Sequence, residues 1–224
     1  MKRAATCYMC DSIETSREHV PPSCFFPKAK EIGRDLRRNL ITVPSCDRHN
    51  SHKSKDDEFL RSVIVMTAGS NKAGQHQFLW KLLPAAARAP RAYKSFFADK
   101  GTVAQGKGRA LQIDRKRFNS CIDHLARAIF FDAYKRKWQL PISIISPNFF
   151  SGIYSDQMVP HQPTVKAVET SRQFLGGEPV RGENPDVFKY RIRYDEVDEG
   201  YAFAAIFYDR FEVYSFSSRG LAKI

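Results

Sequence analysis

The sequence predicts an α+β protein with a helical middle region and an antiparallel, β-rich C-terminal region. Apolar residues recur at helical spacing through much of the stretch from about residue 54 to residue 138. After Pro141, aromatic and β-branched residues run or alternate between turn-forming residues, which is typical of strands. The first 50 residues are instead rich in Cys, His, Pro and Ser and have little periodic pattern. We therefore expect three regions, covering residues 1–68, 69–140 and 141–224.

The first region carries signals for one short strand and one helix. Residues 41–43 are typical of a strand, which we expect Pro44 to end. Residues 54–57 have the pattern of a capping box with acidic residues in a first helical turn. The apolar residues from Phe59 to Thr67 follow at the spacing of one helical face, so a helix is expected there, closed near Gly69.

The middle region is expected to be mostly helical. Between Gln75 and about Ala98 the apolar positions fit two helices, which Pro84 and Pro90 punctuate. Residues 101–109 are expected to form a loop or hairpin, and they lack the Gly-Lys-Ser/Thr ending of a phosphate-binding loop. The segment 115–138 is the longest helix candidate.

Three strands are expected in the last region, over residues 187–194, 201–208 and 211–216. Asp-Glu-Gly and Asp-Arg turns separate them. We interpret these strands as an antiparallel sheet.

Composition excludes several classes of protein. The 224 residues are 42% apolar and 27% charged, which is the profile of a globular rather than a disordered chain. No apolar run approaches the roughly 18 residues of a membrane span, and the start lacks the apolar core of a signal peptide. We therefore expect a cytoplasmic protein whose five cysteines stay reduced and favour metal binding over disulfides.

Positive charge is concentrated in the middle of the chain. The formal net charge is +12, to which residues 1–80 contribute +4, residues 81–140 contribute +10 and residues 141–224 contribute −2. A basic region between less charged ends indicates a surface for a polyanion such as DNA. The alternative is a solvated basic helix without a partner.

Two pairs of metal-ligating residues stand 35 residues apart. Cys7 and Cys10 form a C-x-x-C pair, and Cys46 and His49 form a C-x-x-H pair. Three thiolates and one imidazole complete a tetrahedral Zn²⁺ shell, which would stabilise a segment too short to bury a core. The alternative is that these are buried free thiols, a role for which the two remaining cysteines, at positions 24 and 121, are better candidates.

An acid-His pair followed by an apolar residue and Pro lies between the two pairs, at residues 18–21. Asn-Leu-x-x-Val follows at residues 39–43, and Cys-x-x-His-Asn-x-x-Lys follows at residues 46–53. In this order the motifs resemble an HNH endonuclease over about residues 5–60. The resemblance implies a ββα-metal fold for residues 1–68, in which two short strands and a helix hold one catalytic divalent cation, Mg²⁺ or Mn²⁺.

The resemblance also implies roles for single residues. His19 matches the general base that activates the attacking water, and its unperturbed pKa near 6.5 suits this chemistry. Glu18 matches a carboxylate ligand of the catalytic cation, and Asn50 matches the residue that completes the metal shell. Asn39 matches the Asn that pins the loop carrying the base. The zinc in this scheme is structural.

The sequence departs from the family in two ways. The family more often has Asp where this chain has Glu18, and its last residue is often His. His52, two residues after Asn50, is therefore the reserve ligand. Without a metal, Glu18 and His19 would be an ordinary surface pair.

Basic residues outside the motif are candidates for phosphate contacts. Lys53 and Lys55 precede or begin the expected helix, where a phosphate would be favoured. Arg115, Lys116 and Arg117 are either further phosphate contacts or a plain helix surface.

These observations favour a metal-dependent HNH endonuclease that hydrolyses DNA phosphodiester bonds. The alternatives are a zinc-stabilised nucleic-acid-binding module without catalysis, and a nuclease subunit of a larger complex, such as one in antiphage defence. Expected partners are DNA, with a protein partner or a second copy of the chain as further candidates, and no membrane.

Overall fold

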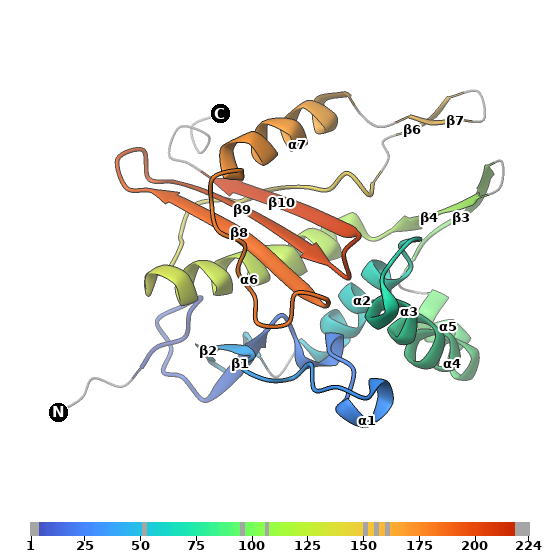
Figure 1. Ribbon diagram of the computed structural model, residues 1–224, viewed down its shortest axis with the longest axis horizontal. Helices are drawn as coiled ribbons and strands as arrows, with labels where there is room; N and C mark the ends of the chain where they lie inside the picture. The colour runs from blue at the N-terminus through green and yellow to red at the C-terminus, as the bar shows by residue number, and fades with distance from the viewer. Residues whose placement is uncertain are drawn as a thin grey trace.

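The computed structural model describes residues 5–50, 53–94, 97–105, 108–149, 152–154, 157–159 and 162–217. It is an α+β structure, as expected, with a four-stranded antiparallel sheet at its centre (Figure 1). The sheet order is β5 (Ser143–Ile145), β10 (Phe211–Ser217), β9 (Gly200–Phe207) and β8 (Phe188–Asp195). The three longest strands of this sheet, β8, β9 and β10, confirm the expected C-terminal strands to within one residue at each end.

One helix covers each face of this sheet: α6 (Arg115–Tyr134) and α7 (Gln162–Leu175) lie on opposite sides (Figure 1). Tyr201, Phe203 and Phe207 share one face of β9 and are buried, and the Tyr201 ring lies 5.6 Å from that of Phe130 in α6. Helix α6 begins as expected at residue 115 but ends four residues before Trp138. The backbone turns left-handed at Lys135, with φ 54°, and this conformation ends the helix.

The N-terminal hairpin pairs β1 (Ser16–Val20) with β2 (Ile41–Ser45) in antiparallel register. Pro44 was expected to end the second strand, but it lies inside β2 opposite Arg17. In a two-stranded sheet each strand has an open edge, where a proline is tolerated because its missing N–H has no ladder partner to lose. The Pro44 carbonyl accepts a hydrogen bond from the Tyr8 amide at 2.8 Å.

The expected first helix is α2 (Ser54–Val65), and its apolar face is buried. The expectation of a capping box at residues 54–57 is wrong. Lys53 occupies the N-cap position, and no side chain caps the helix. Its backbone is already helical (φ −89°, ψ −9°), and its carbonyl accepts hydrogen bonds from the Asp56 and Asp57 amides, both at 2.8 Å. The short segments η1 (Ser23–Phe25) and α1 (Ala29–Ile32) connect β1 toward β2.

The middle region is more finely divided than the two expected helices. It contains α3 (Lys72–Gln77), the π-helix η2 (Phe78–Leu82), α4 (Leu83–Arg88) and α5 (Pro90–Lys94). Pro84 lies in the first turn of α4, where its missing N–H costs little, so it does not break the helical path. Pro90 does begin a new helix. The hairpin of β3 (Phe97–Gln105) and β4 (Gly108–Ile113) follows, and a smaller hairpin joins β6 (Gly152–Tyr154) to β7 (Gln157–Val159).

Buried apolar residues form one cluster that draws on all three expected regions, with Phe25, Phe118 and Phe207 among its fully buried members. The rings of Phe25 and Phe207 lie 5.5 Å apart and join the N-terminal hairpin region to the sheet. The boundaries near residues 68 and 140 stay a prediction. No described helix is both long enough and apolar enough to cross a bilayer.

Candidate functional site

Cys7, Cys10, Cys46 and His49 gather at one point, as the sequence predicts, and their ligand atoms all lie within 4.8 Å of one another. The Sγ atoms of Cys10 and Cys46 are 3.8 Å apart, and the His49 Nδ1 atom lies 3.4–3.6 Å from the three sulfurs. Tetrahedral zinc, with bonds of about 2.3 Å to sulfur and about 2.0 Å to nitrogen, separates its ligands by about 3.8 Å and about 3.5 Å. The cluster therefore fits a structural zinc ion.

Local backbone hydrogen bonds shape both halves of this cluster. The Cys7 amide bonds the Ser12 carbonyl at 2.9 Å, and the His49 amide bonds the Cys46 carbonyl at 2.9 Å. Cys46 directly follows β2, and His49 lies shortly before α2. A metal held here would fix the end of the hairpin against the start of the helix.

Glu18 and His19 are neighbours on β1, but their side chains leave the strand on opposite faces. Glu18 is buried, with a residue exposure of 7%, whereas His19 is exposed. The Glu18 carboxylate forms an ion pair with the Lys53 ammonium and accepts a hydrogen bond from the Ser45 hydroxyl at 3.4 Å. Burial, with Glu18 as a second cause, raises the pKa of Tyr8 well above its usual value.

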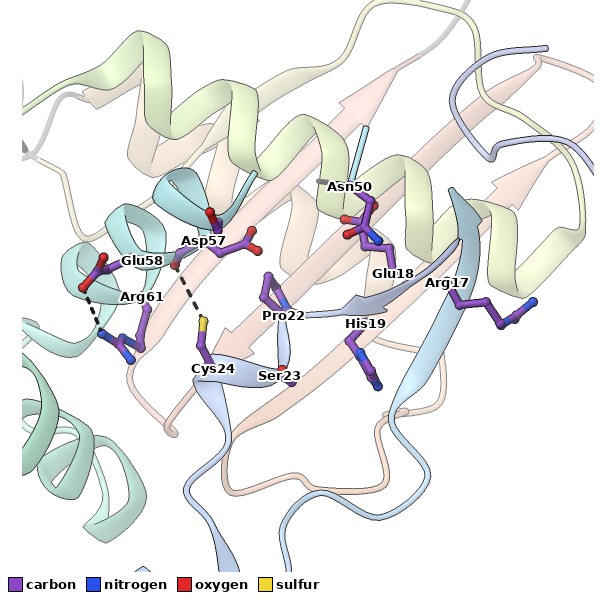
Figure 2. Close-up of a pocket in the computed structure, with 11 residues that line it drawn as sticks. Arg17, Glu18, His19, Pro22, Ser23, Cys24, Asn50, Asp57, Glu58 and Arg61 are labelled. Atoms are coloured by element: carbon purple, nitrogen blue, oxygen red, sulfur yellow. Dashed lines mark hydrogen bonds and ion pairs between the residues drawn. The ribbon is translucent and has the colours of Figure 1, made fainter. Parts of the chain in front are cut away.

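Both residues nevertheless line the same pocket, which has a volume of about 470 Å³ (Figure 2). Asn50 lines it as well, and its side-chain amide donates a hydrogen bond to the Ser16 hydroxyl at 2.8 Å. This bond uses the Asn50 nitrogen and leaves its carbonyl oxygen available as a ligand. His19, Glu18 and Asn50, identified from the sequence, are thus brought together at one cavity.

Two further carboxylates line the pocket, and the sequence reasoning did not assign them to the site. They are Asp57 and Glu58 on α2. Burial raises the pKa of Asp57 to about 6, and nearby Lys53 partly opposes this shift. Asp57 follows Lys53 by four residues, which places both on one helical face, so this spacing was the available signal. Glu58 is engaged elsewhere, because the Tyr93 hydroxyl donates to it at 2.5 Å.

The donor set suits a hard divalent cation. Carboxylate oxygens of Glu18 and Asp57 and the amide oxygen of Asn50 are of the type that Mg²⁺ or Mn²⁺ prefers. The Lys53 ammonium is the cationic partner of Glu18 in this structure. A divalent ion at Glu18 would have to displace it or share the carboxylate with it.

Asn39 lies away from this pocket. It precedes β2 with a left-handed backbone (φ 49°), and its exposed side chain lines a separate hollow beside Val20, Pro21 and Asn184. The structure therefore does not bring Asn39 together with His19. Its role in holding the loop stays a prediction, and His52 lies outside the described residues.

The basic candidates differ in their surroundings. Lys53 is buried at Glu18, whereas Lys55 is exposed at the start of α2. The Arg117 side chain bonds the Asp56 carboxylate at 2.7 Å and the Lys55 carbonyl at 2.9 Å. Its guanidinium also lies 4.5 Å from the centre of the Phe59 ring. Arg117 thus joins α6 to α2.

The other two residues of the Arg115-Lys-Arg cluster are on the surface. The Arg115 guanidinium lies over the Phe149 ring, 4.1 Å from its centre, and burial lowers the pKa of Arg115 from its usual value. Lys116 is exposed. Of the three, Lys116 is the one best placed to meet a phosphate.

Comparisons with protein-family models, with curated proteins and with solved structures gave no match to this chain.

Proposed function

We propose that this chain is a divalent-metal-dependent nuclease of the HNH type that hydrolyses phosphodiester bonds in DNA. The observation that carries the proposal is the position of the pocket. His19, Glu18 and Asn50 line one cavity of about 470 Å³, and Asn50 directly follows His49 of a Cys₃His cluster that fits zinc. A general base, oxygen ligands for a hard cation and a rigid support are the parts that metal-assisted phosphodiester hydrolysis requires.

Each side chain has a separate task in this proposal. His19 is exposed to the pocket, so its imidazole can accept the proton of a water molecule aligned with the phosphorus atom. Glu18 and Asn50 would hold Mg²⁺ or Mn²⁺, which supplies charge stabilisation at the phosphate and at the leaving 3′ oxygen. Because Glu18 and His19 leave β1 on opposite faces, the base and the metal-binding carboxylate approach the phosphate from different sides.

Plasmid cleavage in Mg²⁺ or Mn²⁺ tests this function, with His19→Ala compared to the parent protein. We expect cleavage to fall by about 100-fold or more, since a general base contributes roughly that factor. Zinc content and DNA binding should not change, because His19 is exposed and is not one of the four clustered zinc ligands. His76→Ala is the matched control, since His76 lies on α3 and does not line this pocket.

A second candidate function is a zinc-stabilised nucleic-acid-binding module without catalysis. The ion pair between Lys53 and Glu18 favours it, because a carboxylate that already has a cationic partner has no need of a metal. If neither protein cleaves while both bind DNA, this second function replaces the first, whereas undiminished cleavage by His19→Ala would remove His19 from the role of general base.

A further inference from the structure

An exposed apolar patch lies on the helical segment next to the pocket. Trp80 is 68% exposed, Leu79 is 50% exposed and Leu83 is 46% exposed. Leu82, on the other side of the same turn, is buried at 4%. Leu82 therefore packs η2 against the core, whereas the Trp80 indole points outward and is exposed to solvent. Exposed apolar groups gathered in this way mark interaction sites more often than single exposed ones do.

Basic residues predominate in the sequence around this patch, although Lys81 is paired with the Glu31 carboxylate from α1. No Asp or Glu occurs between Glu58 and Asp99, whereas six basic residues do. Arg88, Arg91 and Lys94 are exposed on α4 and α5, and within the described part of the chain they form no ion pair. The partner that complements this surface is an anion.

Hydrogen bonds tie the patch to the rim of the pocket. The Gln77 side chain, buried at 1%, donates to the carbonyls of Cys24 and Phe25 at 3.2 and 3.0 Å. Cys24 lines the pocket, as does Glu58, to which the Tyr93 hydroxyl donates from α5. A ligand on α3–α5 is thus held at a fixed position relative to His19. Figure 1 shows α3, α4 and α5 grouped at one end of the molecule, beside α2.

We propose that Leu79, Trp80 and Leu83 together with Arg88, Arg91 and Lys94, here named the Trp80 surface, bind an unpaired stretch of the nucleic-acid substrate. A base stacks on the Trp80 indole, and the three cations contact the adjoining phosphates. Stacking on an aromatic ring combined with a basic track is the general way in which proteins hold single strands. The inference deepens the proposed nuclease function and rests on it, because it says where the strand is held outside the pocket.

The small size of the patch favours a nucleic-acid strand over a lipid surface as the partner. An interfacial helix presents a long apolar face, whereas here η2 and α4 together span residues 78–88 and expose three large apolar side chains. One indole next to a row of cations matches the alternation of base and phosphate along a strand.

Binding of a labelled oligothymidine of about 20 nucleotides, without added divalent metal and without chelator, tests the stacking contact. These conditions prevent hydrolysis and leave a structural zinc in place. Trp80→Ala should weaken binding by about tenfold or more, and Trp80→Phe should keep most of the affinity. Val197→Ala is the matched control, because Val197 is 93% exposed on a turn of the C-terminal sheet.

Intrinsic fluorescence reports the same contact directly. The chain has two tryptophans, of which Trp80 is exposed and Trp138 is buried at 7%. We expect the oligonucleotide to quench the parent protein and to leave Trp80→Phe unquenched, since its remaining indole is buried.

The phosphate contacts are tested by the salt dependence of binding. Replacing Arg88, Arg91 and Lys94 together by Ala should reduce the slope of log affinity against log salt by about 2, at about 0.7 per phosphate on a single strand. The control replaces three basic residues of the last region, Lys166, Arg181 and Arg193, and should leave the slope unchanged.

Two results would overturn the inference. One is unchanged oligonucleotide affinity in Trp80→Ala, and the other is Trp80-dependent binding to anionic phosphatidylserine vesicles, or Trp80-dependent self-association, with no binding of the oligonucleotide. The proposed function fails separately. If the oligonucleotide binds in a Trp80-dependent way but nothing is cleaved in Mg²⁺ or Mn²⁺, the proposed nuclease function is wrong and the proposed binding surface stands. If DNA is cleaved but binding does not depend on Trp80, the nuclease function stands and the binding surface is wrong.

Discussion

The Lys53 ammonium and the Glu18 carboxylate form an ion pair that is almost fully removed from solvent, with side-chain exposures of 11% and 8%. The two residues are 35 positions apart and come from the start of α2 and from β1. The pair places a positive charge at the carboxylate that the HNH resemblance assigns to the metal. It therefore ties the stability of the hairpin to the chemistry of the pocket.

Lys53→Met should lower the free energy of unfolding by about 3–5 kcal/mol, because it leaves a buried carboxylate without a partner. The double variant Glu18→Gln, Lys53→Met should be less destabilised than Lys53→Met alone. Urea denaturation measures both. If the site holds a cation, millimolar Mn²⁺ should restore part of the loss in Lys53→Met and nothing in the double variant. Equal stability of Lys53→Met and the parent would show that the pair is not a buried one.

Zinc binding should depend on the three cysteines of the cluster and not on Cys24 or Cys121. We expect one zinc ion per chain in protein purified without added metal, and its loss together with N-terminal folding in Cys46→Ser. Cys121→Ser is the control. Burial raises the pKa of Cys24 to about 11 and that of Cys121 to about 12, so both stay protonated thiols at neutral pH. Elemental analysis decides, and a folded parent protein without zinc would contradict the assignment.

Asn50→Ala should reduce cleavage strongly and raise the concentration of Mg²⁺ needed for half-maximal rate, since it removes an oxygen ligand. Asn50→Asp should need less metal than Asn50→Ala, because it keeps an oxygen at that position. A metal titration of plasmid cleavage gives these values. An active Asn50→Ala beside an inactive His52→Ala would transfer the ligand role to His52.

Arg117→Ala should lower the free energy of unfolding by about 1–2 kcal/mol, because it removes a charged hydrogen bond to Asp56 and the packing on Phe59. Lys116→Ala, its exposed neighbour, should change stability by less than about 0.5 kcal/mol. Urea unfolding compares them. If Arg117→Ala is as stable as the parent, the contact between α6 and α2 is energetically unimportant.

Features that depend on neighbouring residues could be predicted from the sequence. Alternation of apolar residues marked the three long strands, because successive side chains of a strand face opposite sides of a sheet. The x-x spacing of Cys7 with Cys10 and of Cys46 with His49 indicated a common metal, because such a tight turn offers both ligands to one ion. His19, Glu18 and Asn50 were identified from the order of short motifs, and all three line one pocket.

Features that depend on contacts between distant segments could only come from the tertiary structure. A helical pattern tells which face of α2 is buried but not that Lys53 meets Glu18, or that Asp57 lines the cavity. The basic run at residues 115–117 does not reveal that the Arg117 side chain forms an ion pair with Asp56. The sequence does not tell which apolar residues of 78–83 are buried, and tertiary packing buries Leu82 while it leaves Trp80 68% exposed. Sequence alone therefore indicated the C-terminal strands, α2, α6 and the four residues of the Cys₃His cluster, and packing between distant segments decided which charged and aromatic groups remain available to a partner.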